Sequence, residues 1–368
     1  MRVTAAVLEA HDQPFRLTDV HLEGPGPDEV LVRIAGTGFC HTDLLPRATH
    51  MGIALPVIAG HEGSGVVEET GVHVTSVSPG DPVVLSFDSC GGCRACLAAR
   101  PANCATFFPR NLTGRRPDGS GTARTGDGRT VSAWWFGQSS FAGHVVVPAR
   151  AVVPVPSEVS ADIPLEILGP LGCGFQTGAG AVLNSLAVRP GSRIVVAGAG
   201  AVGLAAIMAA HAVGATTVVA VELHPARRRL AADLGATHVL DGADPDLGRE
   251  LDRIVGGAAD YALDTTGAPS LITTLVNSLH AYGTCGLVGV QHGDLTVDPM
   301  LLAAGRTLKG IIEGDAVPRL FIPRLIGLWR QGRFPFDRLI RTYPLHDIAR
   351  AERDTARGDV VKAVLLPS

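Results

Sequence analysis

The fold is decided by the stretch Arg193-Ile-Val-Val-Ala-Gly-Ala-Gly-Ala-Val-Gly203, in which a β-branched run leads into glycines spaced G-x-G-x-x-G. An Ala-rich segment follows at residues 201–212, and a second Val-rich run ends at Glu222, nineteen residues after Gly203. This order predicts a strand, a glycine turn, a helix and a parallel strand, the unit that binds a dinucleotide pyrophosphate at a helix N-terminus. The predicted cofactor contacts of the turn are Gly198, Gly200, Ala201, Val202 and Gly203.

Strand and helix patterns alternate on both sides of this stretch, over residues 168–310. The expected strands lie at residues 194–197, 218–222, 261–264 and 283–290, and the expected helices at 201–212 and 226–234. Because parallel strands need helical crossovers, this alternation predicts an α/β domain with a doubly wound parallel sheet.

Residues 1–167 have a different pattern, in which short strands are separated by Gly and Pro. Examples are residues 29–35, 65–69 and 81–86. This spacing predicts an antiparallel β-barrel domain. The polar, glycine-rich residues 115–130 are expected to form an exposed loop, and the tail 311–368 is expected to return to the first domain through a strand near its end.

Composition and charge limit the possible partners. Of 368 residues, 46% are hydrophobic and 18% are charged, which is ordinary for a folded globular protein. Lys and Arg number 31 against 35 Asp and Glu, so the net charge of −4 gives no field for nucleic acid or anionic lipid. Charged residues within residues 1–17 argue against a signal peptide. Glycines interrupt the long apolar stretch 194–221, which argues against a membrane-spanning helix there. We expect a cytoplasmic protein that binds a small molecule and no membrane.

Four of the seven cysteines cluster within fifteen residues, as Cys90, Cys93, Cys96 and Cys104. Two-residue gaps allow one turn to supply several thiolates to a tetrahedral ion, and four thiolates leave no open position. The spacing therefore predicts a structural zinc site, with an iron–sulfur cluster as the alternative.

Other metal-ligand types are scattered along the chain, in Cys40-His-Thr-Asp43, Gly60-His-Glu-Gly63 and Gly172-Cys-Gly174. One imidazole and two thiolates form a known set for catalytic zinc, which keeps its fourth position open. Taken alone, a buried Cys or His is more often a core residue than a metal ligand. Cys285 has no assigned role.

The order of these motifs resembles the zinc-dependent medium-chain alcohol dehydrogenases over nearly the whole chain. Residues 171–180, 136–141 and 311–316 are similar to segments of the bacterial aryl (benzyl) alcohol dehydrogenases and their geraniol-type relatives. The resemblance implies a GroES-like barrel domain and a Rossmann domain. It also implies that Cys40, His61 and Cys173 hold the catalytic zinc.

The resemblance implies further roles beside that zinc. Glu62 would act as a transient fourth ligand, and Asp43 would orient His61, although Asp43 could instead cap its loop. The hydroxyl of Thr42 would accept the substrate proton. Many relatives end this proton relay in a histidine, but that position is Leu45 here, so solvent could finish the relay.

For the cofactor, Glu222 favours NAD because a carboxylate binds the ribose 2′-OH and repels a 2′-phosphate. Arg227, Arg228 and Arg229 offer a route for NADP, or form a solvated helix face. By resemblance, the remaining cofactor contacts are His41, Thr177, Arg227, Val288, Val290 and Lys362. His41 could equally be a solvated loop residue.

The predicted activity is interconversion of a primary, aromatic or allylic alcohol and its aldehyde, with two zinc ions and NAD. Trp135 is expected to line the substrate pocket, although it could be a core residue. The alternatives are a glutathione-dependent formaldehyde dehydrogenase, a polyol dehydrogenase and a non-catalytic nucleotide-binding relative. A homodimer or homotetramer is expected by resemblance alone.

Overall fold

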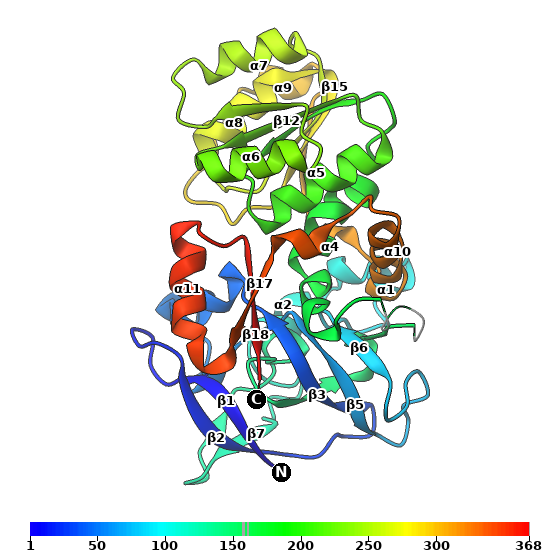
Figure 1. Cartoon of the computed structure of the whole chain (residues 1–368), viewed down its shortest axis with the longest axis vertical. Helices are drawn as coiled ribbons and strands as arrows, with labels where there is room; N and C mark the ends of the chain where they lie inside the picture. Colours follow the sequence, from blue (N-terminus) through cyan, green and yellow to red (C-terminus); the bar gives the residue numbers. More distant parts are fainter. Residues whose placement is uncertain (157–158, 160–161, 368) are drawn as a thin grey trace. The chain divides into compact units, whose positions relative to one another are not determined.

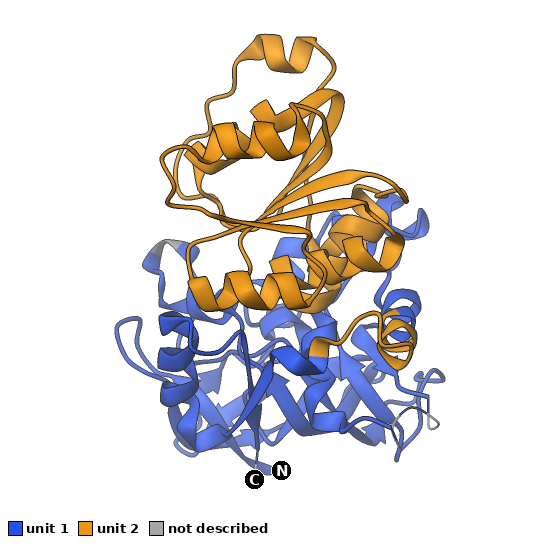
Figure 2. Ribbon diagram, turned by 45° about the horizontal axis from the view of Figure 1, so that its top comes forward, with its two compact units in different colours: residues 1–173, 317–324, 337–368 blue, residues 174–316, 325–336 orange. Residues whose placement is uncertain are grey.

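The computed structural model describes residues 1–156, 159 and 162–367 of the chain (Figure 1). The chain divides into two compact units, shown in Figure 2. Unit 1 comprises residues 1–173, 317–324 and 337–368, and unit 2 comprises residues 174–316 and 325–336. The predicted boundaries lie at 167/168 and 310/311, whereas the units of the structure change at 173/174, 316/317, 324/325 and 336/337.

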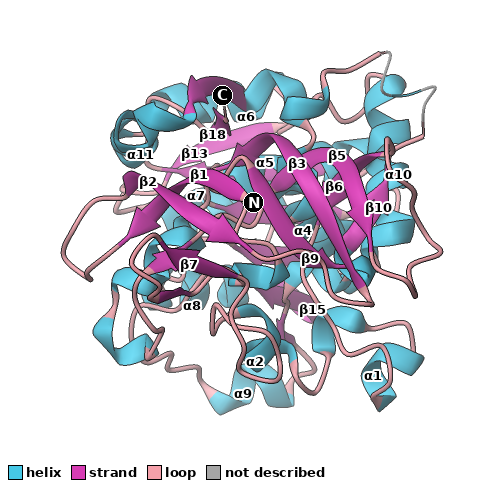
Figure 3. Cartoon of the chain, turned by 90° about the horizontal axis from the view of Figure 1, so that it is seen from below, coloured by secondary structure: helices cyan, strands magenta, loops and turns pink. Residues whose placement is uncertain are grey.

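Unit 1 is built from two sheets that are antiparallel at nearly every pairing, seen from below in Figure 3. The larger sheet has the order β10 (Val152–Pro154), β6 (Pro82–Leu85), β5 (Gly63–Thr70), β3 (Glu29–Gly38), β18 (Lys362–Leu366) and β17 (Ile340–Pro344), with β9 (His144–Pro148) also paired to β3. The other has the order β4 (Val57–Ile58), β1 (Arg2–Leu8), β2 (Arg16–Leu22), β7 (Ala123–Thr125) and β8 (Thr130–Val131). The predicted barrel is confirmed, and in the tail strand β18 pairs with β3.

The expectation of a continuous exposed loop over residues 115–130 is wrong in part. Strand β7 occupies Ala123–Thr125 and pairs with β2 and β8. Gly128, at φ 87°, lies in the turn between β7 and β8, a conformation that glycine adopts without strain. Ala123 and Val131 are buried, but two apolar positions in a polar stretch are too weak a pattern to predict strands.

Unit 2 contains a parallel sheet with the strand order of a Rossmann domain. The order is β13 (His238–Asp241), β12 (Thr217–Glu222), β11 (Arg193–Ala197), β14 (Ala259–Asp264), β15 (Leu279–Leu287) and β16 (Thr307–Gly310). Helices α5 (Ala201–Val213), α6 (Pro225–Asp233), α7 (Leu247–Val255) and α8 (Pro269–Ser278) connect successive strands. The predicted doubly wound sheet is confirmed, and Val195, Val219 and Ile272 lie in its fully buried core.

The described part of the chain also contains the helices α1 (Arg94–Leu97), α2 (Phe107–Asn111), α4 (Gly174–Gly180), α9 (Pro299–Ala303), α10 (Pro318–Arg330) and α11 (Ile348–Arg357). The long apolar stretch 194–221 is β11, α5 and β12, as its glycines predict. Among the described residues, no helix combines the length and the apolar character that crossing a membrane requires.

The glycine turn between β11 and α5 depends on Gly203. A Cβ at that position would lie 1.9 Å from the backbone oxygen of Gly198, so the helix can approach the turn only without a side chain there. At Gly200, the N-cap of α5, a Cβ would point into open space, with no packed neighbour within 4 Å. The two glycines therefore make different demands on the fold.

Gly203→Ala should destabilise unit 2 by about 1–3 kcal/mol, because the added methyl group displaces backbone. Gly200→Ala should change the stability by less than about 0.5 kcal/mol, since its methyl group meets open space. The measurement is the midpoint of thermal unfolding followed by circular dichroism. Equal midpoints for the two variants would contradict this account of the turn.

Candidate functional site

Three side chains from distant segments of unit 1 meet at one point. The Sγ atoms of Cys40 and Cys173 and a ring nitrogen of His61 all lie within 4.8 Å of one another. Cys40 is the N-cap of the 3₁₀ helix η1 (His41–Arg47), and Cys173 directly follows the 3₁₀ helix η7 (Gly169–Gly172). The structure thus brings together the three ligands that the resemblance implies for catalytic zinc.

Glycines allow these segments to come close. Gly60, just before His61, has φ 89°, and a Cβ there would lie 2.5 Å from the backbone nitrogen of Phe141. Gly172, just before Cys173, packs against β6, where a Cβ would lie 1.9 Å from the oxygen of Leu85. Side chains at either position would push a ligand away from the others.

The buried carboxylate of Asp43 fixes the imidazole. Its Oδ1 accepts from Nδ1 of His61 at 2.7 Å and from the Gly60 backbone at 2.9 Å, and its Oδ2 accepts from the Cys40 backbone at 3.0 Å. Asp43 therefore meets both expectations, since it contacts His61 and also caps the start of η1. Because Nδ1 is used, only Nε2 of His61 is available to an ion.

The donor set fits a zinc ion. His61 Nε2 is buried and has no hydrogen-bond partner among the described residues, which is costly unless a ligand satisfies it. The hydrogen bond from Cys173, together with the charge of His61, holds the pKa of Cys40 well below its usual value. A thiolate beside an unpartnered imidazole nitrogen is the chemistry that zinc requires, and three protein donors leave a position open.

Burial would lower the pKa of His61, but the negative charges of Asp43 and Cys40 outweigh that effect and raise it well above its usual value. The site is therefore strongly attractive to positive charge. A divalent ion would replace the proton as the source of that charge.

Glu62 and Lys362 form a buried ion pair beside this set. Lys362 Nζ lies 2.8 and 2.7 Å from the two carboxylate oxygens of Glu62, and it also donates to the Phe39 backbone at 3.2 Å. Burial raises the pKa of Glu62 although Lys362 opposes the shift. Glu62 is the predicted contact of the zinc ion, and Lys362 is the predicted contact of the cofactor pyrophosphate. In this structure the two side chains bind each other, because neither charge can be buried alone.

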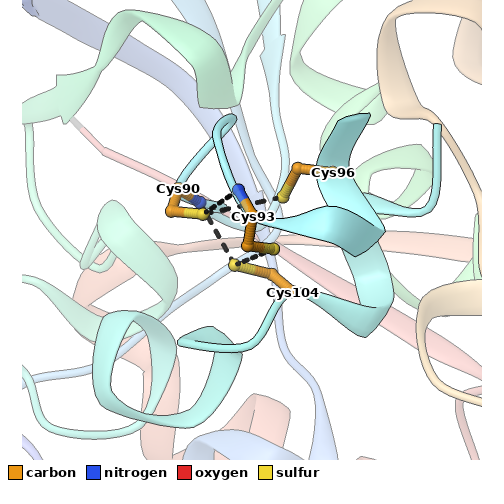
Figure 4. A group of neighbouring side chains, drawn as sticks. All are labelled: Cys90, Cys93, Cys96 and Cys104. Carbon is orange, nitrogen blue, oxygen red and sulfur yellow. Dashed lines mark hydrogen bonds between the residues drawn. The ribbon is translucent and has the colours of Figure 1, made fainter. Parts of the chain in front are cut away.

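The four-cysteine group forms a second set of donors, in the lobe around α1 (Figure 4). The Sγ atoms of Cys90 and Cys96 are 3.9 Å apart, and those of Cys93 and Cys104 are 4.0 Å apart. Tetrahedral zinc with bonds of about 2.3 Å would place sulfur atoms roughly 3.8 Å apart, so the geometry fits.

Backbone groups of the lobe also favour thiolates. The amide of Cys93 donates to Sγ of Cys90 at 3.2 Å, and the amide of Ala105 donates to Sγ of Cys93 at 3.4 Å. Amide donors from Ala105 and Cys96 lower the pKa of Cys93 to about 6. Burial, with a hydrogen bond to Cys93, instead raises the pKa of Cys96 to about 12. Cys93 is therefore a thiolate at neutral pH, whereas Cys96 would lose its proton on binding a cation.

Phe136 is a site residue that sequence reasoning missed. Its ring stacks on His61 with centroids 4.5 Å apart and planes at 25°. Trp135, the predicted pocket residue, is fully buried and contacts Phe136 edge to face at 5.5 Å. The run of aromatic residues at 134–136 was the available signal, but it does not say which ring faces the ligand.

In unit 2, Glu222 is hydrogen-bonded to the predicted cofactor turn. Its carboxylate accepts from the backbone of Ala199 at 2.7 Å and of His224 at 2.9 Å, so it lies beside the glycines. Arg228 binds Asp241 and the backbone oxygen of Glu222, so its guanidinium group is already bound within unit 2. Arg227 has a buried Nε without a partner among the described residues.

The remaining predicted contacts lie in varied surroundings. Thr177, in α4, donates to buried Glu313 at 3.4 Å, an acid that the sequence did not point to. The predicted strand 283–290 ends at Leu287, so Val288 and Val290 follow β15, and Val290 is 65% exposed. In η1, His41 is exposed, and Thr42 and Leu45 are half-buried.

Cys285 lies outside both donor groups. It is fully buried in β15 of the unit 2 core. Burial, with a contribution from Asp264, raises its pKa to about 12. The residue is therefore a core thiol with no nucleophilic character at neutral pH.

Comparison with known proteins agrees with this geometry. Residues 26–157 match the family model for the alcohol dehydrogenase GroES-like domain, and residues 201–326 match that for zinc-binding dehydrogenases. The geraniol dehydrogenase of Castellaniella defragrans is 46% identical over 366 residues, which cover 98% of this chain and 97% of that protein.

Solved structures match over the full length of both chains. The benzyl alcohol dehydrogenase of Acinetobacter calcoaceticus is 38% identical with a TM-score of 0.94. An alcohol dehydrogenase zinc-binding domain protein from Burkholderia ambifaria is 45% identical with a TM-score of 0.96. These matches confirm the resemblance, and the chain belongs to the zinc-dependent medium-chain alcohol dehydrogenase family.

Proposed function

We propose that this protein interconverts a primary allylic or aromatic alcohol and its aldehyde by hydride transfer with NAD. One zinc ion would be held by Cys40, His61 and Cys173, and a second by the four-cysteine lobe. The observation that carries the proposal is that Cys40, Cys173 and His61 bring their ligand atoms within 4.8 Å of one another, while the buried Nε2 of His61 has no hydrogen-bond partner within the geometric limits among the described residues. Such a set has room for one further ligand, which a substrate oxygen can fill.

A zinc ion at this set supplies Lewis acidity, which lowers the pKa of an alcohol and polarises a carbonyl oxygen. Thr42 follows Cys40 by two residues in η1, and its hydroxyl can accept the alcohol proton and pass it on. Leu45 cannot continue the relay, so solvent takes the proton. The Glu62 carboxylate holds Lys362 and keeps that buried positive charge near the ligands.

The choice of NAD rests on Glu222. Its carboxylate, at the carboxyl end of β12, is in the position that accepts hydrogen bonds from the adenosine ribose, and a 2′-phosphate there would meet a negative charge. Arg228 is bound to Asp241 and so is a poor partner for that phosphate. These contacts support NAD over NADP.

The substrate class is supported by the relatives and by the aromatic residues next to the ligand. The names of two relatives specify geraniol, an allylic alcohol, and benzyl alcohol. Phe136 and Trp135 give the segment beside His61 a flat, apolar character. A conjugated alcohol suits such surroundings because ring and alkene faces pack well on aromatic side chains.

The test is reduction of the cofactor followed by absorbance, with benzyl alcohol, cinnamyl alcohol, geraniol and ethanol as substrates. We expect turnover of the three conjugated alcohols with kcat/KM at least tenfold above ethanol, and faster reduction of NAD than of NADP. Metal analysis should give two zinc ions per chain. A zinc-loaded protein that is inert to all four alcohols would contradict the proposal.

Removing one cysteine from each donor set should have different effects. Cys173→Ala should abolish turnover and retain one zinc per chain, with a thermal midpoint close to that of the wild type. Cys96→Ala should mainly lower the thermal midpoint, because a closed thiolate site contributes folding energy. Metal content, turnover and thermal unfolding measure these outcomes, and equal loss of folding in both variants would refute the division of roles.

A further inference from the structure

Aromatic rings connect the four-cysteine lobe to the metal ligand His61. Phe107 contacts Phe136 edge to face, with centroids 6.4 Å apart and planes at 82°. Phe136 then stacks on the imidazole of His61 at 4.5 Å. Phe107 and Phe136 are 4% and 6% exposed, so both rings are held by packing.

The position of Phe107 depends on the lobe. Phe107 begins α2, and its backbone amide donates to the oxygen of Cys104 at 2.9 Å. Its own oxygen accepts from Asn111 at 2.7 Å, and Asn111 accepts from the backbone of Asp88, two residues before Cys90. Phe107 is therefore tied to both ends of the four-cysteine segment.

Phe136 has a strained backbone. Its φ of 51° and ψ of 34° lie in the left-handed region, which is unfavourable for a bulky residue. Neighbouring bonds hold the turn: Ser139 Oγ accepts from the Trp135 amide at 2.8 Å and donates to Ile58, and Gln138 Nε2 donates to the His61 oxygen at 2.8 Å. The structure around it maintains a conformation that Phe136 would not adopt alone.

The strained backbone places the Phe136 ring where it can fix the plane of the His61 imidazole. The hydrogen bond from Nδ1 to Asp43 fixes one ring atom, but the ring can still tilt about that contact. A stacked ring fixes the plane of the imidazole and therefore the direction of the Nε2 lone pair. Asp43 and Phe136 together determine where Nε2 points.

We propose that Phe136 is a positioning residue for the metal ligand His61, and that Phe107 makes this positioning depend on the filled four-cysteine lobe. The inference rests on the proposed metal at Cys40, His61 and Cys173. It predicts that a change of ring at residue 136 or 107 weakens that site without removing any of its ligands.

The test uses the full-length protein loaded with ¹¹³Cd, whose NMR resonance separates a four-thiolate site from a site with two thiolates and an imidazole. For Phe136→Leu we expect a shifted two-thiolate resonance, an unchanged four-thiolate resonance and about 10- to 100-fold weaker cadmium affinity at the former. Phe136→Tyr keeps the ring and should restore both the resonance and the affinity.

Phe107→Leu should shift the same two-thiolate resonance by less. The matched control is Phe108→Leu, because Phe108 is the next residue of α2, is 64% exposed and contacts Phe107 edge to face with centroids 5.8 Å apart. That control should leave both resonances at their wild-type positions.

A wild-type resonance and affinity in Phe136→Leu would overturn the proposal. If Phe136→Leu does not fold, the comparison of Phe107→Leu with Phe108→Leu decides, and identical spectra for the two would overturn it. A wild-type protein with no two-thiolate resonance at all would instead contradict the proposed function, and the inference would fail with it.

Discussion

Burial of the Asp43 carboxylate is the constraint on which the site depends. A carboxylate removed from water must have its oxygens hydrogen-bonded, and here the donors are the backbone of Cys40, the backbone of Gly60 and Nδ1 of His61. Satisfying this one charge therefore brings η1 against the turn that carries the imidazole. It also selects the tautomer in which Nε2 carries a lone pair, which is the form that binds a metal.

The end of the chain completes the same region. Lys362, the first residue of β18, enters a buried pair with Glu62, and breaking such a pair would leave an uncompensated charge. Gly38, near the end of β3, allows the approach, since a Cβ there would lie 1.9 Å from Oε2 of Glu62. Strand β18 thus supplies a buried positive charge beside the metal ligands.

Features formed by residues close together in the sequence could be predicted, whereas contacts between distant residues could not. The four-cysteine spacing and the glycine fingerprint each lie within a short segment of sequence, so both could be found from the sequence. The doubly wound parallel sheet followed from the alternation of strands and helices. The partner of Lys362 could not be found, because 300 residues separate it from Glu62. The stacking of Phe136 on His61 was also hidden, because it requires a left-handed backbone that no sequence pattern assigns to a phenylalanine. Strands β7 and β8 were missed because their buried faces are so short.

The most direct test of the central claim is zinc-edge anomalous diffraction from crystals of the zinc-loaded protein. We expect a peak bonded to Sγ of Cys40, Sγ of Cys173 and Nε2 of His61, at about 2.3 Å from sulfur and about 2.0–2.1 Å from nitrogen. A fully loaded crystal with zinc only among the four cysteines, or with zinc bound to Nδ1 of His61 and Asp43 displaced, would contradict it.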